Sequence, residues 1–361
     1  MTPSEPRAPL STHDDLSVEI ISREDSARRD LVVPPSFGLH FPRGWRPEPV
    51  KNRYADGMER ATIAWLKSYG IGCKPEEEAT LDKFNCGMYG GYSLPMANWH
   101  AGLLVTQFIS LWLFWDDVQV EEEQGWDIDE VIAALTSPEP PRCASRYIAA
   151  WSDIGRRLQR SQSDAWLENL GATMRQWLEN AKVETGMAKA YRRKGVCPEL
   201  STLFDVRTVS IGMYPTFHLI ELAEGFELPD AFHRHETVVE MKRLASRLVG
   251  MGNDLGGLAK DIANRWLNLV LILQDRASTR VEDAFQRVVD IHNAEARDFD
   301  RLAASLPSWG AALDPLVEGW VQAVRYNVHG FALWESTADR YQEYRAVVGN
   351  KALIAPVAAA A

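Results

Sequence analysis

From Asn52 onward, apolar residues recur at spacings of three and four along most of the chain. Leu167, Leu170, Met174 and Leu178 form one such series. This spacing places apolar side chains on one face of an α-helix. Alternating runs of β-branched residues, which would indicate strands, are not found. The pattern therefore predicts an all-α protein.

Prolines and glycines divide this pattern into separate helices. The predicted helices cover residues 52–69, 76–86, 95–121, 127–136, 143–161, 163–193, 199–211, 214–224, 230–262, 265–275, 279–304 and 311–345. The first thirty or so residues lack an apolar period, and residues 31–50 carry five prolines. We therefore expect residues 1–50 to be a disordered or extended segment. The Ala-rich residues 346–361 are expected to be a flexible tail.

The net charge of −11 argues against binding to a nucleic acid or to an anionic membrane surface. An anionic substrate would be repelled by the same field. A site for such a substrate must therefore be locally cationic or filled by a metal ion.

No segment is expected to span a membrane, because the most apolar stretch, Ala101 to Trp115, is too short and contains polar residues. The four cysteines are widely separated, and the N-terminus has no signal peptide pattern. These features are typical of a reduced, cytoplasmic protein.

The first candidate site is an acidic cluster, DDVQVEEE, at residues 116–123, directly after a strongly apolar helix. At about 100° per residue, Trp112 and Asp116 share one face of that helix. A carboxylate above an apolar cavity is costly unless it is paired or bound to a metal. The alternative interpretation is a solvated helix end.

The second candidate site is the segment NDLGGLAKD at residues 253–261. Asn253, Gly257, Lys260 and Asp261 fall on one helix face, which offers an amide oxygen, a carboxylate and an ammonium group together. Mg²⁺ takes oxygen ligands of this kind and usually completes its shell with water or substrate phosphate oxygens. Two such clusters, far apart in sequence, predict a Mg²⁺ site that binds a diphosphate. The alternative is an exposed polar helix face.

Four elements, in this order, resemble a bacterial class I terpene synthase over about residues 50–345. They are the acidic cluster after an aromatic helix, the segment LFDVRTVSIG at 203–212, NDLGGLAKD, and the closing WESTADRY at 334–341. Arg207 lies 46 residues before Asn253, where this family carries an arginine that senses diphosphate. The resemblance implies one domain, residues 51–345, that forms a helical bundle around a central active-site cavity.

The resemblance also implies roles for single residues. The implied metal ligands, for three Mg²⁺ ions assembled with a prenyl diphosphate, are Asp116, Asp117, Glu121, Asn253, Asp261 and the position of Gly257. The implied diphosphate donors are Arg207, Lys260, Arg340 and Tyr341. Ser210 and the carbonyl of Ile211 align with the helix break that responds to the sensing arginine.

The chain departs from the family pattern at three of these positions. Val120 occupies the place of the second aspartate of a DDxxD motif, so the acid must come from Glu121, about 140° away from Asp116 on an ideal helix. Gly257 stands where the family usually has Ser or Thr. Asp261 replaces the usual Glu. These departures place single ligands in question, not the resemblance.

The implied chemistry is metal-assisted departure of diphosphate, which leaves an allylic cation that aromatic faces stabilise. Trp112 and Trp334 are the first candidates for the cavity wall, followed by Phe108 and Phe331. The alternative for each of them is ordinary core packing. His233 and His235, which flank Arg234, are expected at the surface.

Three functions remain open from the sequence. A terpene synthase that acts on farnesyl diphosphate is favoured, with geranyl or geranylgeranyl diphosphate as other substrates. A chain-elongating prenyltransferase shares the helical bundle but needs two DDxxD motifs. A non-catalytic helical protein that binds an isoprenoid is the third. The resemblance is also compatible with a homodimer.

Overall fold

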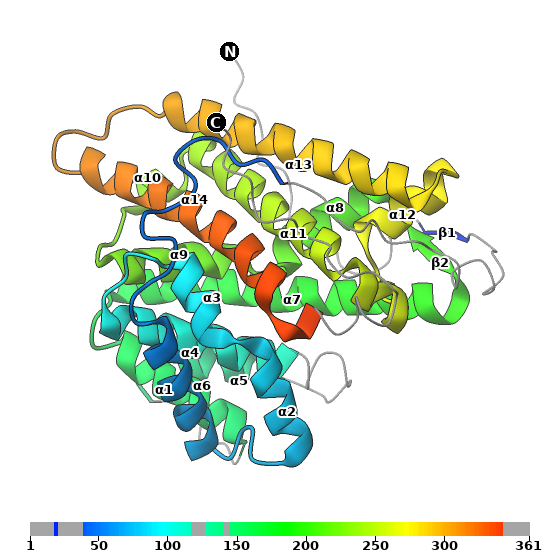
Figure 1. Ribbon diagram of the computed structural model, residues 1–361. Helices are drawn as coiled ribbons and strands as arrows, with labels where there is room; N and C mark the ends of the chain where they lie inside the picture. Colours follow the sequence, from blue (N-terminus) through cyan, green and yellow to red (C-terminus); the bar gives the residue numbers. More distant parts are fainter. Residues whose placement is uncertain (1–17, 21–38, 117–126, 140–144, 342–361) are drawn as a thin grey trace.

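Helices make up most of the described chain, which consists of residues 18–20, 39–116, 127–139 and 145–341 of the computed structural model (Figure 1). In chain order they are α1 (Ala55–Ser68), α2 (Pro75–Phe84), α3 (Cys86–Ser93), α4 (Trp99–Trp115), α5 (Ile128–Thr136), α6 (Arg146–Leu158), α7 (Asp164–Lys194), α8 (Leu200–Ser210), α9 (Met213–Glu224), α10 (Asp230–His233), α11 (Glu236–Asn264), α12 (Leu269–Ala277), α13 (Val281–Ala304) and α14 (Asp314–Thr337).

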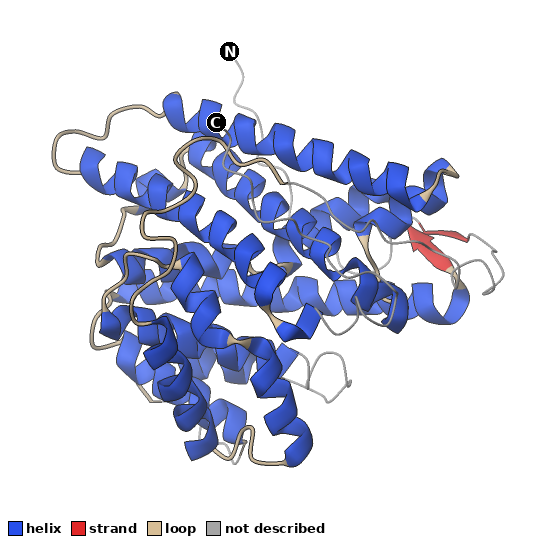
Figure 2. Cartoon of the chain, in the orientation of Figure 1, coloured by secondary structure: helices blue, strands red, loops and turns tan. Residues whose placement is uncertain are grey.

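The prediction of an all-α protein is confirmed, with one small exception that the sequence pattern did not indicate. Two short strands, β1 (Val18–Ile20) and β2 (Val196–Pro198), pair antiparallel beyond the C-terminal end of α7 (Figure 2). None of the described helices is long and apolar enough to cross a membrane.

The long helices α7, α11 and α14 run through the molecule, and most of the shorter helices pack against at least one of them (Figure 1). α11 packs against α8, α9, α13 and α14, whereas α7 packs against α5, α8 and α9. α4 lies against α9 and the N-terminal helices α1 and α3. The space between these helices is where the candidate site lies.

Local signals fix where α4 and α7, two of the helices that line the cavity, begin and end. α4 begins after Asn98, whose side chain accepts hydrogen bonds from the backbone N–H groups of His100 and Ala101. α7 begins after Ser163, which caps Trp166 in the same way. α7 ends at Gly195, whose positive φ of 65° stops the helix and favours glycine.

The predicted helices were wrong in several places. The helix predicted at 230–262 is two helices, α10 and α11, and other helices begin or end a few residues away from their predicted bounds. α3 was missed, because its glycines hide the apolar period. These glycines allow close packing, since a Cβ on Gly87 would lie 2.4 Å from the carbonyl oxygen of Ala55 on α1. α14 was predicted to continue to residue 345 but ends at Thr337, because Ala338 adopts an extended conformation.

The described residues 39–54, which precede α1, form no helix, yet some of them belong to the core. Leu39, Phe41 and Trp45 are buried, and the indole N–H of Trp45 donates to Asp300 on α13 at 3.0 Å. Residues 39–50 therefore help to hold α13 in place. Residues 21–38 lie outside the described part of the chain.

A buried polar network joins α7, α9, α10 and α11. Glu221 is fully buried, its Oε1 lies 2.9 Å from Nε2 of His233, and its Oε2 accepts from the indole N–H of Trp166 at 3.1 Å. The ammonium of Lys242 lies 2.8 Å from the other ring nitrogen of His233. The expectation of a surface position for His233 was therefore wrong, since its side chain faces Glu221.

The same network has the composition of a metal site, because ligand atoms of His218, Glu221 and His233 lie within 4.8 Å of one another. Lys242 argues against a metal ion there. Burial lowers its pKa to about 8, so its ammonium remains protonated at neutral pH and supplies the positive charge that Glu221 needs. We interpret the network as a charge-balanced buried group that orients α9.

Two buried histidines predict that the protein loses stability in acid. Burial lowers the pKa of His292 and of His329 to about 4. Below pH ~6.5 the unfolded chain binds protons at these positions and the folded chain does not, so the free energy of unfolding falls as pH drops toward 4. From pH 7 to 5 each histidine should contribute a loss of about 2 kcal/mol.

Urea denaturation at the two pH values measures this loss. His329→Phe removes one of the two histidines that bind a proton only on unfolding. The part of the pH dependence of the free energy of unfolding that the two histidines cause should therefore fall by about half. An unchanged dependence in the variant would show that His329 is already protonated, or exposed, in the folded protein.

Candidate active site

The candidate site is a cavity lined by α3, α4, α7, α8, α9, α11, α14 and the segments that follow α11 and α14. The structure brings most of the sequence-predicted site residues to its wall. These are Trp112, Asp116, Arg207, Ser210, Ile211, Asn253, Gly257, Lys260, Asp261, Phe331, Trp334, Arg340 and Tyr341. Asp117 and Glu121 lie outside the described residues.

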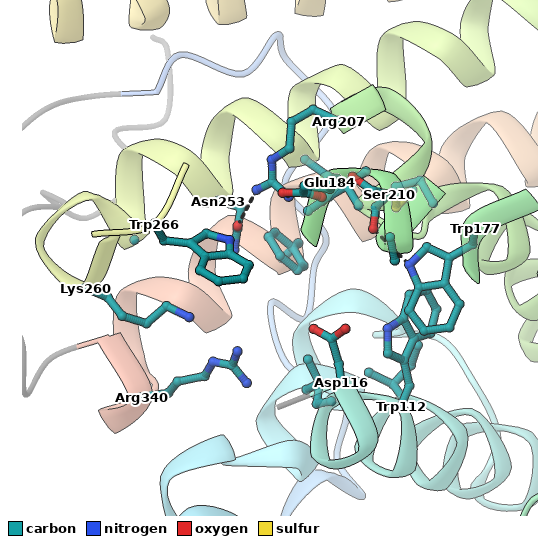
Figure 3. A pocket seen from close by; sticks show the side chains of 18 of the residues that line it. Trp112, Asp116, Trp177, Glu184, Arg207, Ser210, Asn253, Lys260, Trp266 and Arg340 are labelled. Atoms are coloured by element: carbon teal, nitrogen blue, oxygen red, sulfur yellow. Dashed lines mark hydrogen bonds and ion pairs between the residues drawn. The ribbon is translucent and has the colours of Figure 1, made fainter. Parts of the chain in front are cut away.

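Acidic and basic side chains face the same cavity from different sides (Figure 3). Asp116, at the C-terminal end of α4, faces the cavity opposite Arg207 and Asn253. Lys260 and Arg340 extend into it from a third side. Basic and acidic side chains therefore converge on one space, although the protein as a whole carries a net charge of −11.

Arg207, on α8, is held by carboxylates from two other helices. Its guanidinium donates to Oδ1 of Asp254 at 2.6 and 3.2 Å and to Glu184 at 3.1 Å. Asp254 is 1% exposed, and its Oδ2 also accepts from the backbone N–H of Leu269 at 2.9 Å. Burial raises the pKa of Asp254, and the charge of Arg207 opposes that shift. The buried pair fixes the position of Arg207 relative to α11.

Asn253 connects this group to the end of α14. Its side-chain oxygen accepts from Arg207 at 2.7 Å, and its amide nitrogen donates to Glu335 at 2.6 Å and to the hydroxyl of Tyr341 at 3.2 Å. An amide oxygen has two lone pairs, so one remains when Arg207 is bound. Asn253 therefore retains the capacity to act as a ligand.

Asp261 lies two turns further along α11 and is 6% exposed. Burial raises its pKa to about 7, although Lys260 and a hydrogen bond of 2.8 Å from Asn268 favour the charged form. The charged carboxylate is thus costly in this surrounding and would be stabilised by a bound cation. The oxygen donors of Asp116, Asn253 and Asp261 are of the kind that hard divalent metal ions prefer.

Tryptophans form the apolar wall next to the polar groups. The rings of Trp112 and Trp177 are in contact, with centroids 3.8 Å apart. The indole N–H of Trp177 donates to the carbonyl oxygen of Ser210 at 2.8 Å. On the other side, Trp334 donates to the carbonyl oxygen of Phe84 at 2.7 Å.

Phe108 was expected in this wall and is not part of it. It is fully buried behind Trp112, in edge contact with the ring of Trp151. One turn of α4 separates the two positions, so they share a face of the helix. Only the nearer one reaches the cavity, because Trp151 on α6 covers the other.

Sequence reasoning did not identify several of the lining residues, among them Trp177, Glu184 and Trp266. Trp177 and Glu184 are seven residues apart on α7 and so lie on one face. A carboxylate on the same face as a buried tryptophan was a signal that could have indicated the cavity. Trp266 follows α11 in a loop and left no periodic signal.

The model of a known family matches residues 107–298, more than half of the chain; it is described as terpene synthase family 2, C-terminal metal binding. The chain belongs to terpene synthase family 2. The matched range contains Asp116, Arg207 and the segment from Asn253 to Asp261. Arg340 and Tyr341 lie beyond it.

Curated relatives of this terpene synthase are similar over most of their length. A (+)-T-muurolol synthase from Roseiflexus castenholzii, described as (2E,6E)-farnesyl diphosphate cyclizing, is 27% identical and covers 80% of this chain and 89% of its own. The pristinol synthase of Streptomyces pristinaespiralis is 26% identical, over 82% and 84% of the two chains.

Solved structures show the same fold. The crystal structure of a-eudesmol synthase superimposes with a TM-score of 0.71 and 17% identity, over 86% of this chain and 100% of that one. Germacradien-4-ol synthase from Streptomyces citricolor gives a TM-score of 0.67 at 17% identity, over 85% and 98% of the chains. The predicted class I terpenoid synthase bundle is therefore confirmed as the fold.

Proposed function

We propose that this terpene synthase ionises an acyclic prenyl diphosphate, with farnesyl diphosphate favoured, and cyclises the resulting cation to a terpene. The observation that carries the proposal is the division of one cavity into a polar end and an aromatic wall. Carboxylates and basic groups from α4, α8, α11 and the end of the chain's described part form the polar end, and Trp112, Trp177 and Trp334 form the wall. The farnesyl preference rests on the relatives' names.

In this proposal, Asp116, Asn253 and Asp261 would hold magnesium, and a water would take the place of a side-chain ligand at Gly257. Asp117 and Glu121 remain proposed ligands outside the described residues. When bound, magnesium, as three ions in our proposal, would supply Lewis-acid stabilisation of the leaving diphosphate. The raised pKa of Asp261 supports a cation at this place, because burial alone disfavours its charged form.

The proposed roles of the other residues follow from their charge and position. Arg207, Lys260, Arg340 and the hydroxyl of Tyr341 bind diphosphate oxygens and neutralise charge as it develops. Trp112 and Trp334, with Phe331, present ring faces to the cation and keep water away from it.

We further propose that residues 51–345 form the catalytic domain, with 346–361 as a tail. The contacts of Leu39, Phe41 and Trp45 extend its core into the preceding segment. We also propose that the protein is cytoplasmic and forms a homodimer.

Incubation of the purified protein with Mg²⁺ and geranyl, farnesyl or geranylgeranyl diphosphate tests the function. We expect cyclic C15 products from farnesyl diphosphate by gas chromatography and an equal amount of released diphosphate. Elongated products formed with isopentenyl diphosphate would instead identify a prenyltransferase. Stoichiometric binding without turnover of any substrate would identify a non-catalytic isoprenoid-binding protein.

Gly257→Ser is expected to be tolerated and to lower the Mg²⁺ concentration for half-maximal activity. A Cβ at this position would lie 3.6 Å from Oδ2 of Asp261 and 3.8 Å from the ring of Tyr341, which are ordinary contact distances. The hydroxyl could then replace a metal-bound water.

Gly257→Ala is the matched control, because it adds the same Cβ without the hydroxyl. The two Mg²⁺ titration curves should differ, with the serine variant half-saturated at the lower concentration. If serine and alanine shift the curve equally, or serine weakens Mg²⁺ dependence, the position does not face a metal ion.

A further inference from the structure

The helix break between α8 and α9 lies on the cavity wall. α8 ends at Ser210, α9 begins at Met213, and Gly212 between them has a φ of +83°. In an uninterrupted helix the carbonyls of Ser210 and Ile211 would accept from the N–H groups of residues 214 and 215. Residue 215 is a proline, which has no N–H. The helix therefore cannot supply a donor from that residue to the Ile211 carbonyl.

The Ser210 carbonyl has a donor from outside the helix. The indole N–H of Trp177, on α7, donates to it at 2.8 Å, and the side chain of Trp177 is almost completely buried (Figure 3). The two carbonyls of the break therefore differ in their hydrogen-bond donors. A side chain from another helix satisfies the first, and a proline withholds the helical donor from the second.

Trp112 fixes the other side of the break. Its ring contacts that of Trp177, and a Cβ built on Gly212 would overlap it at 1.9 Å. Glycine is therefore required at 212 both for the positive φ and for this contact. The two tryptophans hold the backbone of the break in one position.

The family resemblance already assigns the carbonyl of Ile211 to this break. We propose in addition that Trp177 is a positioning residue. Its indole N–H engages the Ser210 carbonyl, so that the Ile211 carbonyl, left without its helical donor by Pro215, is the electron-rich group that the break offers to a cation in the cavity. This inference rests on the proposed function. A carbonyl oxygen carries partial negative charge, and the C-terminal end of α8 adds to it. How far a cation rearranges before it loses a proton or meets water then depends on this carbonyl.

Trp177→Phe and Pro215→Ala test the two halves of the inference. Trp177→Phe keeps an aromatic ring and removes the N–H that engages Ser210. Pro215→Ala introduces an N–H that is able to bond the Ile211 carbonyl. Position 215 lies in the first turn of α9, where both proline and alanine are compatible with a helix. Both variants should raise the ratio of early-terminated to fully cyclised products by about two- to tenfold, the range expected for one hydrogen bond.

Trp151→Phe is the matched control. Trp151 is fully buried, does not line the cavity, and its indole N–H has no hydrogen-bond partner in the described part of the chain. The Trp151→Phe variant should be destabilised, as Trp177→Phe is, but should keep the wild-type product ratio. A loss of folded protein lowers the yield of all products and leaves their ratio unchanged.

The products are compared by gas chromatography with farnesyl diphosphate and Mg²⁺, after circular dichroism has shown that each variant is folded. If the wild type is active and both Trp177→Phe and Pro215→Ala keep its product ratio, the inference is overturned. The same holds if Trp151→Phe changes the ratio as much as Trp177→Phe. A wild type that converts no prenyl diphosphate overturns the proposed function itself, which is a separate outcome.

Discussion

Asp116→Asn is expected to lower kcat/KM by about 10²- to 10⁴-fold while leaving the fold intact. The substitution keeps the shape of the side chain and removes the charge that a divalent metal ion needs. Asp116 ends α4 at the cavity wall and is not part of the hydrophobic core, so the free energy of unfolding should change little. Treatment of the wild type with EDTA should abolish turnover in the same way, and added Mg²⁺ should restore it.

Asp127→Asn is the matched control for charge. Asp127 is exposed and caps α5, where asparagine serves equally well. It should retain wild-type kcat/KM. If Asp116→Asn were as active as this control, Asp116 would not be a metal ligand. Turnover that persists in metal-free protein would refute the metal-dependent reaction as a whole.

Arg207→Met is expected to destabilise the protein by about 3–5 kcal/mol, because it leaves the buried carboxylates of Asp254 and Glu184 without their cation. The double variant Arg207→Met, Asp254→Asn removes one of these charges and should recover a large part of that loss. It should not recover activity, since the guanidinium is also proposed to bind diphosphate.

Urea denaturation and kcat/KM measured on the wild type, both single variants and the double variant separate these two roles. The stability of Asp254→Asn alone is needed to calculate how much of the stability recovered in the double variant comes from the interaction between Arg207 and Asp254. A single Arg207→Met variant as stable as the wild type would show that the pair contributes no net stability. A double variant with wild-type activity would show that Arg207 supports the fold only.

Local patterns in the sequence predicted the helices that carry the site. The apolar period along residues 163–193 and 230–262 anticipates α7 and α11, because a helix that packs in a bundle must repeat its apolar face about every 3.6 residues. The spacing of Asn253, Lys260 and Asp261 likewise anticipated that they face one cavity, since one rigid helix carries all three.

Periodicity does not tell whether a buried face meets another helix or a cavity, and here the sequence alone was insufficient. Phe108 and Trp112 share a face of α4, but only Trp112 reaches the cavity, because Trp151 from α6 covers Phe108. Trp177 has the pattern of a core residue and lines the cavity. The inward position of His233 depends on Glu221 and Lys242, which come from other helices.

What the sequence determined by itself is therefore the set of helices and the chemistry that each presents, because both depend on residues a few positions apart. The tertiary structure decided which of these faces meet. The acidic group of α4 lies across the cavity from Arg207 and Asn253, and Trp177 from α7 reaches the break after Ser210. Such contacts join residues far apart in the chain, and they depend on how all the helices pack at once, which no local spacing records.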